Sequence, residues 1–236
     1  MNGVFLLITL LMMKRIHCIV EGQTELTVFT NILAPYILSK TGSYISFSTL
    51  KYTGGGIVNY SKLFVELRNH LRDKEKILTT FFDYYGILES HHFPNYQEAK
   101  QKQSDPTKGV QLLEQGIADD LKSKGIETKN FVPYIQLHEF EALLFSSVEG
   151  FSLLNNPSIV ADIKSIITRY ENPEDINDSP LTAPSKRIIA IFEKQGLRYE
   201  KIIDGNNIAT KIGIETLMER CPRFRNWVQL LIDKTL

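Results

Sequence analysis

Short apolar runs alternate with stretches of helical apolar spacing along the first half of the chain, and they predict strands and helices in turn. A short apolar run over 16–20 is typical of a buried strand, and apolar residues then recur at helical spacing over 24–39. A β-rich stretch over 44–50, a helical pattern over 59–72 and a strand that ends at Asp83 follow. This βαβαβ order predicts a parallel sheet with right-handed crossovers.

The second half of the chain changes from mixed to helical character. Residues 87–107 are mostly polar and contain two prolines, so we expect a long loop or lid there. A helix over 110–123 and a fourth strand over 131–136 would complete the sheet. We therefore predict an α/β fold, a parallel sheet flanked by helices, with an α/β core over 13–136 and a helical C-terminal region over 137–236 that completes the site.

The composition is that of a globular protein with a core, since 43% of residues are apolar and 23% are charged. Cys18 and Cys221 are too few for a disulfide framework and lack zinc-ligand spacing, which favours a reducing, cytoplasmic compartment. The apolar run over 4–13 is too short to cross a bilayer, so we predict no membrane partner. We interpret residues 1–12 as an N-terminal extension from an over-extended start.

The formal net charge of zero hides an uneven distribution. Residues 136–181 carry eight acids and two bases, a net −6, and residues 182–236 carry six acids and ten bases, a net +4. The chain can therefore present a basic face to an anion without a large overall basic excess.

Two acidic residues stand where predicted strands end. Glu21 follows the first strand and precedes Gly22, which permits a tight turn, and Asp83 follows the third strand. Ligands of open α/β sheets bind beyond the carboxyl ends of the strands. Mg²⁺ prefers a few carboxylate oxygens, so we predict a hard-metal site here, with Glu21 as a metal ligand or a general base. The alternative for each residue is an ordinary exposed turn.

A third acidic segment, residues 136–145, closes the fourth strand and is expected to open a helix. Glu139 and Glu141 are two residues apart and cannot share a helical face, so we expect at most one of them, preferably Glu139, to reach the site. A glutamate in a first helical turn also has a purely structural explanation, the helix dipole. His138 is a candidate ligand, proton shuttle or plain hydrogen-bonding residue.

Residues 182–187 place Pro184 at a helix start and cations directly behind it. Lys and Arg are misplaced in a first helical turn unless an anion compensates them, so we interpret Ser185, Lys186 and Arg187 as a phosphate clamp. In the alternative, Ser185 caps the helix and the cations pair with a nearby acidic segment, namely Glu171, Glu174, Asp175 and Asp178.

Three further features carry weaker signals. The glycine run over 54–56 could cradle phosphate, although a flexible turn is the simpler interpretation. Lys201 and the pair Asp204-Gly205 are expected in a turn. Pro222 is expected to start a helix with an apolar core face, flanked by arginines that could contact a phosphate, namely Arg220, Arg223 and Arg225.

Several short motifs together carry a family resemblance. The segment 20–25, Val-Glu-Gly-Gln-Thr-Glu, resembles the first motif of Toprim domains, especially those of the overcoming-lysogenization-defect nucleases. The whole chain from Met13 resembles a Toprim-like family, domain of unknown function four-two-seven-six. The other matching segments are 133–136, 138–145, 176–178, 183–187, 204–205 and 221–224 with Trp227.

The resemblance implies a Toprim/Rossmann-like sheet in which a strand-tip Glu and an Asp-x-Asp pair bind Mg²⁺, or Mn²⁺, during phosphodiester chemistry. Glu21 matches that Glu and Asp83 the first Asp, but Tyr85 replaces the second Asp, which puts the number of metal ions in doubt. Asp83 would then need help from Glu139, Glu25 or Glu141. Gly22 and His138 join the phosphate clamp as candidate phosphate-binding residues.

These inferences lead to a magnesium-dependent nuclease for DNA or RNA. The resemblance implies a setting beside an AAA-type ATPase in prokaryotic anti-phage defence. One alternative is a non-catalytic Toprim-like module that regulates the ATPase, and another is a mononucleotide-binding protein. The sequence leaves open whether the protein is a monomer or a homodimer.

Overall fold

The computed structural model describes residues 14–50, 59–102, 104–177 and 182–236. The interpretations of the apolar N-terminal run and of the glycine run over 54–56 fall outside these residues, as does Asp178. Among the described helices, none combines the length and the apolar character that crossing a bilayer requires.

The sheet is parallel throughout, with strand order β2-β1-β3-β4. Its strands are β1 (Arg15–Val20), β2 (Ile45–Thr49), β3 (Lys76–Asp83), β4 (Phe131–Val132) and β5 (Ile135–Gln136), and β5 also pairs with β3. The predicted fourth strand over 131–136 is thus two short strands. Pro133 lacks an N–H donor, and the N–H of Tyr134 bonds to the Thr80 hydroxyl (3.0 Å) instead of a strand carbonyl.

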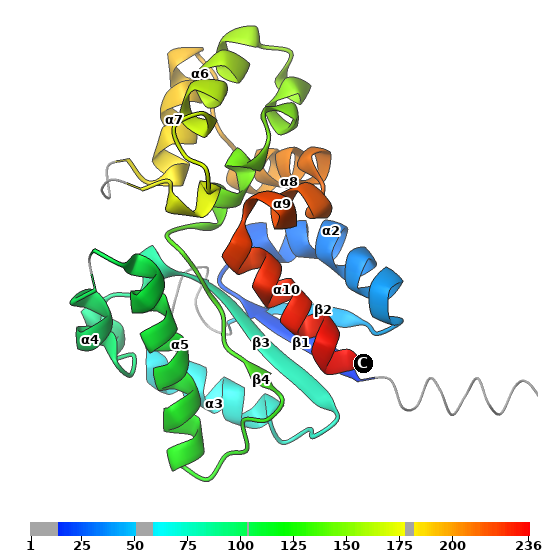
Figure 1. Ribbon diagram of the computed structural model, residues 1–236, viewed down its shortest axis with the longest axis vertical. Helices are drawn as coiled ribbons and strands as arrows, with labels where there is room; N and C mark the ends of the chain where they lie inside the picture. The colour runs from blue at the N-terminus through cyan, green and yellow to red at the C-terminus, as the bar shows by residue number, and fades with distance from the viewer. Residues whose placement is uncertain (1–13, 51–58, 103, 178–181) are drawn as a thin grey trace, which may run out of the picture.

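Helices cover both faces of the sheet, as predicted (Figure 1). One face packs against α2 (Gln23–Thr41) and α10 (Pro222–Thr235), and the other against α3 (Tyr60–His70) and α5 (Pro106–Ser123). Side chains of β1 alternate between the two cores, Cys18 facing the first and Ile19 the second. In the first core, the indole N–H of Trp227 in α10 donates to the Thr79 hydroxyl of β3 (2.8 Å).

The predicted long loop over 87–107 is wrong, because short helices fill it. These are η2 (Glu89–His91) and α4 (Tyr96–Lys100), with η1 (Tyr84–Gly86) directly before the segment and α5 beginning at Pro106. Ile87, Phe93 and Ala99 are buried in the core shared with α5. The few apolar residues of this polar segment therefore anchor it to the sheet layer.

The C-terminal part is helical, as predicted, but it begins with 3-10 turns instead of an α-helix. Its elements are η3 (Phe140–Ser146), η4 (Val148–Leu154), α6 (Pro157–Ile167), η5 (Pro173–Asp175), α7 (Pro184–Lys194), α8 (Lys201–Ile212) and α9 (Ile214–Arg220), followed by α10. In Figure 1, α6 and α7 lie beyond the end of the sheet, whereas α8 and α9 lie beside α2. Lys201 and Asp204-Gly205 belong to α8, so the expected turn at these residues is wrong.

Glu174 is a buried cap for a helix 48 residues further along the chain (174 to 222). Its carboxylate oxygens accept hydrogen bonds from the N–H groups of Arg223 (2.8 Å) and Phe224 (3.1 Å), and the side chain is fully buried. Glu174 therefore serves α10, whereas Asp178 lies outside the described residues, so the alternative in which the acidic segment pairs with Lys186 and Arg187 stays a prediction.

We expect Glu174→Ala to lower the free energy of unfolding by roughly 2–3 kcal/mol, because two N–H donors at the start of α10 lose their acceptors. Glu174→Gln keeps one acceptor oxygen and should lose about half as much. Urea unfolding of the two variants beside the wild-type protein measures both losses. Unchanged stability of Glu174→Ala would contradict the role of Glu174 as a cap.

Candidate carboxylate site

Glu21 and Asp83 lie side by side at the carboxyl ends of β1 and β3. These adjacent strands form the switch point of the sheet, since β2 lies on one side of β1 and β3 on the other. Oε2 of Glu21 accepts a hydrogen bond from the Asp83 N–H (3.0 Å), and Oδ1 of Asp83 accepts one from the Phe140 N–H (2.9 Å). The two predicted strand-tip acids therefore meet.

Gly22 and Glu25 form the start of α2 at the same sheet edge. The N–H of Gly22 donates to Oε2 of Glu25 (3.0 Å), and Glu25 is buried. A Cβ on Gly22 would come within 3.2 Å of the same Glu25 oxygen. The absence of a side chain at Gly22 thus lets the Glu25 carboxylate lie against the backbone and accept the hydrogen bond from its N–H.

Glu139 and Glu141 approach the strand tips from different directions. Oε2 of Glu139 accepts a hydrogen bond from the N–H of Ser185 at the start of α7 (2.9 Å). Glu141 is only 2% exposed and forms an ion pair with Lys201, the first residue of α8 (2.8 Å). Glu139 precedes η3 with an extended backbone and Glu141 lies within it, and both contribute to the site, whereas we expected at most one of them.

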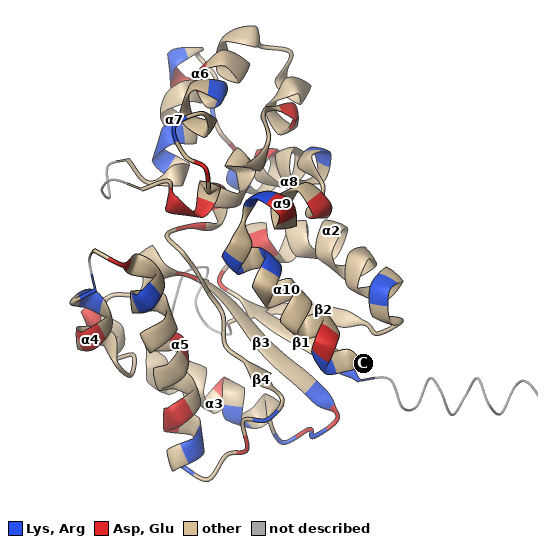
Figure 2. Ribbon diagram, viewed as in Figure 1, with Lys and Arg blue, Asp and Glu red and all other residues tan. Residues whose placement is uncertain are grey.

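We call Glu21, Glu25, Asp83, Glu139 and Glu141 the carboxylate cluster. Burial and the neighbouring carboxylates raise the pKa of Asp83 well above its usual value. Burial raises the pKa of Glu21 to about 7, although its hydrogen bond from Asp83 and the charge of Lys201 act in the opposite direction. The pKa values of Glu25 and Glu141 are also raised, first by burial. In Figure 2, acidic positions of the ribbon lie where the end of the sheet meets the C-terminal helices.

His138 is buried next to the cluster and packs on Tyr85. Its backbone adopts a left-handed conformation (φ 69°), its carbonyl accepts a hydrogen bond from the Tyr85 N–H (3.2 Å), and the two rings are 5.3 Å apart. Nδ1 of His138 lies 3.2 Å from the amide nitrogen of Asn177. Burial lowers the pKa of His138 to about 4. The position of the missing second Asp is therefore filled by an aromatic pair.

The predicted phosphate clamp is only partly assembled. Ser185 is buried and its N–H is bound to Glu139, so the start of α7 contacts the cluster. Lys186 is exposed. Arg187 donates from Nε to the Thr182 carbonyl (2.6 Å) and its guanidinium lies 5.8 Å from the ring of Tyr170. Arg223, the candidate phosphate contact near the C-terminus, forms an ion pair with Glu114 (2.7 Å).

Lys201 is the residue that the sequence interpretation undervalued. Its charge acts to lower the pKa values of Glu21, Glu25 and Glu141, whereas the cations that we expected at the site were Lys186 and Arg187 of the phosphate clamp. The signal was present in the helical spacing of positions 201, 205, 208, 209 and 212, which places Lys201 on the apolar stripe of α8. We missed this helical spacing because we expected a turn at Asp204-Gly205.

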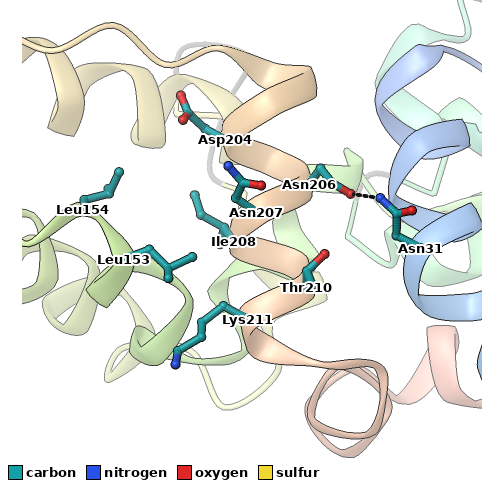
Figure 3. A pocket seen from close by; sticks show the side chains of 9 residues that line it. All are labelled: Asn31, Leu153, Leu154, Asp204, Asn206, Asn207, Ile208, Thr210 and Lys211. Atoms are coloured by element: carbon teal, nitrogen blue, oxygen red, sulfur yellow. Dashed lines mark hydrogen bonds between the residues drawn. The ribbon is translucent and has the colours of Figure 1, made fainter.

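A separate cavity of roughly 650 Å³ lies on another side of α8 (Figure 3). The amide of Asn31 in α2 donates across it to Asn206 of α8 (2.8 Å). No member of the carboxylate cluster lines it. Its lining residues are Asn31, Leu153, Leu154, Asp204, Asn206, Asn207, Ile208, Thr210 and Lys211.

The cluster fits a divalent cation by donor type, because buried carboxylate oxygens are the ligands that Mg²⁺ and Mn²⁺ favour. Gly86 supports this fit, since a Cβ there would come within 3.1 Å of Oε1 of Glu21 and crowd the carboxylate. Within the described residues, no three acidic, His or Cys side chains converge as ligands. Each carboxylate of the cluster already uses one oxygen in a hydrogen bond from a backbone N–H group or in the ion pair with Lys201. Side chains must therefore move before three of them can bind one ion.

The cluster predicts that stability without divalent cations falls as the pH rises from 6.5 to 8. A carboxyl whose pKa is raised in the folded state contributes its full stability below the pKa of the unfolded state, about 4.5 for Glu21. This stability is lost as the pH rises through the pKa of the folded state, about 7 for Glu21. His17 and His138, with pKa values lowered from 6.5 to about 4, act oppositely, but only below pH 6.5.

We expect a loss on the order of 1–2 kcal/mol in EDTA between pH 6.5 and 8, and its reversal by millimolar Mg²⁺. Thermal unfolding at four pH values, with EDTA or Mg²⁺, measures it. A flat profile in EDTA would contradict the raised pKa values.

Fold and site together define a class, a parallel α/β protein with an acidic site at the switch point of its sheet. Within this class, the chain belongs to the family described as Domain of unknown function (DUF4276), whose match covers residues 20–232. The predicted family is thereby confirmed.

No curated protein matches the chain. Among solved structures, the C-terminal region of the Xanthomonas campestris pv. campestris OLD protein is 12% identical with a TM-score of 0.47, and the match covers 96% of this chain and 95% of that chain. The C-terminal region of the Burkholderia pseudomallei OLD protein is 16% identical with a TM-score of 0.46, over 95% and 99% of the two chains.

Proposed function

We propose that this protein is a divalent-metal-dependent phosphodiesterase that cleaves nucleic acid, DNA or RNA. The observation that carries the proposal is the carboxylate cluster at the switch point, in which the acids raise one another's pKa values and Lys201 is the cation that faces them. Burying like charges is costly unless a ligand compensates them, and a divalent cation does so. Perturbed acids of this kind gather at functional sites.

Asp83 and Glu139 would hold the cation, with Glu21 as a third ligand or as the base for the attacking water, and with Glu25 or Glu141 in place of the absent second Asp. When bound, Mg²⁺ or Mn²⁺ supplies Lewis-acid chemistry and lowers the pKa of its bound water. Lys201 would neutralise charge on the scissile phosphate, beside the start of α7 with Ser185 and Lys186. Gly22 and His138 would add contacts to the phosphate.

The cellular setting in the proposal rests on the family resemblance. We propose that the protein is the effector partner of an AAA-type ATPase in prokaryotic anti-phage defence, acting in the cytoplasm without a membrane partner. Within the described part of the chain, few cationic side chains lie near the cluster, so we expect weak binding of nucleic acid by this protein alone. A partner that supplies phosphate contacts would raise the affinity, which supports the dependence on an ATPase.

A second candidate function is a non-catalytic module that regulates the ATPase. The observation that favours it is the packing of Tyr85 against His138, which fills the position of a second carboxylate with a ring. It predicts binding to the ATPase without cleavage under any metal condition.

The test incubates purified protein with supercoiled plasmid and with total RNA, in Mg²⁺, Mn²⁺ or EDTA, with and without the neighbouring ATPase. Cleavage that requires a divalent cation supports the nuclease and identifies its substrate. Binding of the ATPase without cleavage of either nucleic acid in any of these conditions would overturn the nuclease in favour of the regulatory module.

A further inference from the structure

Tyr199 carries a buried hydroxyl that has no hydrogen-bond partner within the described part of the chain. The side chain is 7% exposed, and the Phe192 ring packs against it edge-on with the centroids 5.4 Å apart. Buried hydroxyls normally find a partner, because an unsatisfied one costs stability. This residue immediately precedes the turn into α8, which presents Lys201 to the carboxylate cluster.

The hydroxyl lies beside Gly205 of α8 and close to the first turn of α2. A Cβ at position 205 would lie 3.1 Å from the Tyr199 oxygen and 3.5 Å from Cγ2 of Thr24, so Gly205 leaves room between the hydroxyl and the first turn of α2. Thr24 precedes Glu25 directly. Burial, and after it the charges of Glu141, Asp204, Glu25 and Glu139, raise the pKa of Tyr199.

We propose that Tyr199 is a positioning residue for the proposed metal site. Its hydroxyl donates a hydrogen bond to an oxygen atom that enters the cluster with the divalent cation, either a cation-bound water or a phosphate oxygen of the substrate. The inference rests on the proposed function. A phenol suits this task because it is a neutral donor, adds no charge to the cluster, and stays protonated beside four acids.

A purely structural role for Tyr199 makes a different prediction. If the ring only fills space beside Phe192, removal of the hydroxyl should leave metal binding unchanged. Tyr199→Phe separates the two roles, since it keeps the ring and removes only the donor. Tyr60→Phe is the matched control, because Tyr60 is equally buried (8% exposed) but its hydroxyl donates to Asp120 (2.7 Å) in the other core of the sheet.

The experiment titrates the wild-type protein and both variants with Mn²⁺ by calorimetry, with and without inorganic phosphate, and records the melting temperature of each metal-free protein. We expect Tyr199→Phe to melt no lower than the wild type and to bind Mn²⁺ at least tenfold more weakly. Tyr60→Phe should melt at a lower temperature and bind Mn²⁺ with wild-type affinity, because it loses a satisfied hydrogen bond far from the cluster.

The outcomes distinguish the two proposals. Weaker binding of Mn²⁺ alone by Tyr199→Phe supports a water as the acceptor, and a defect that appears only with phosphate supports a phosphate oxygen. Equal affinity of Tyr199→Phe and wild type in both arms overturns the inference and leaves the proposed metal site standing. Absence of Mn²⁺ binding by the wild-type protein overturns the metal site itself.

Discussion

Glu21→Gln is expected to lower the rate of nucleic acid cleavage by about a thousandfold or more while leaving the fold intact. Loss of a metal-binding or water-activating carboxylate removes several kcal/mol of transition-state stabilisation, and each 1.36 kcal/mol is a factor of about ten in rate. Glutamine still offers an oxygen to the Asp83 N–H, which Glu21 accepts at 3.0 Å, so the strand tips keep their geometry. Cleavage of plasmid and RNA in Mg²⁺ measures the loss.

The same substitution should stabilise the metal-free protein at pH 8, which separates a functional effect from a folding defect. Glu21 has a pKa of about 7 and is charged at pH 8, where burial and the nearby Glu25 oppose its charge. Removing this charge should raise the free energy of unfolding by about 1 kcal/mol or more. Glu98→Gln, at an exposed position on α4, should change neither property. An active Glu21→Gln enzyme would contradict the assignment of Glu21.

Local periodicity predicted the sheet layer well because each strand and helix there is fixed mainly by its own apolar pattern. The first strand and the helix over 24–39 lie within two residues of β1 and α2. The same pattern placed Glu21 and Asp83 at strand tips, and the strand-tip rule for parallel sheets then brought them together. Both faces of β1 are buried, so its apolar run identifies a central strand of the sheet.

The remaining parts of the site depend on contacts that no local pattern encodes. Glu139 and Glu141 do not share one regular helix, because Glu139 precedes η3 with an extended backbone (φ −143°, ψ 156°) and Glu141 lies within the 3-10 turn. Ser185 joins the site through the hydrogen bond from its N–H to Glu139, which lies 46 residues earlier in the chain. Tyr199 and Lys201 appear as members of the site only once α8 lies beside the start of α2. Long-range packing thus decides which of several acidic and basic candidates share the site.

The cluster is consistent with a site that is destabilised in the absence of its ligand. Four carboxyls with raised pKa values share one edge of the sheet, and the compensation from the chain consists of backbone N–H groups and Lys201. A core that served stability alone would gain from apolar residues at these positions. The strain at a ligand-binding site of this kind is relieved when the ligand binds, which couples stability to metal and substrate.

Lys201→Met is therefore expected to affect both stability and cleavage. Glu141 is 2% exposed and would lose its ion-pair partner, which lies at 2.8 Å. We therefore expect the free energy of unfolding at pH 8 to fall by about 2 kcal/mol. The loss is smaller than for a fully buried pair because solvent screens Lys201, whose side chain is half exposed. The loss should shrink at pH 5, because the pKa of Glu141 is already raised and the carboxyl can take up a proton. Urea unfolding at the two pH values measures the difference.

Cleavage should fall at least a hundredfold in Lys201→Met, because the cation that faces the scissile phosphate is lost. The double variant Lys201→Met, Glu141→Gln separates the two effects, since it removes the unpaired buried charge and should recover most of the stability at pH 8 without recovering cleavage. Lys211→Met, at an exposed position on the same helix, is the matched control and should stay within 0.5 kcal/mol of wild type. If the double variant regained both stability and cleavage, Lys201 would be a structural partner of Glu141 and the phosphate would have to be neutralised from the start of α7.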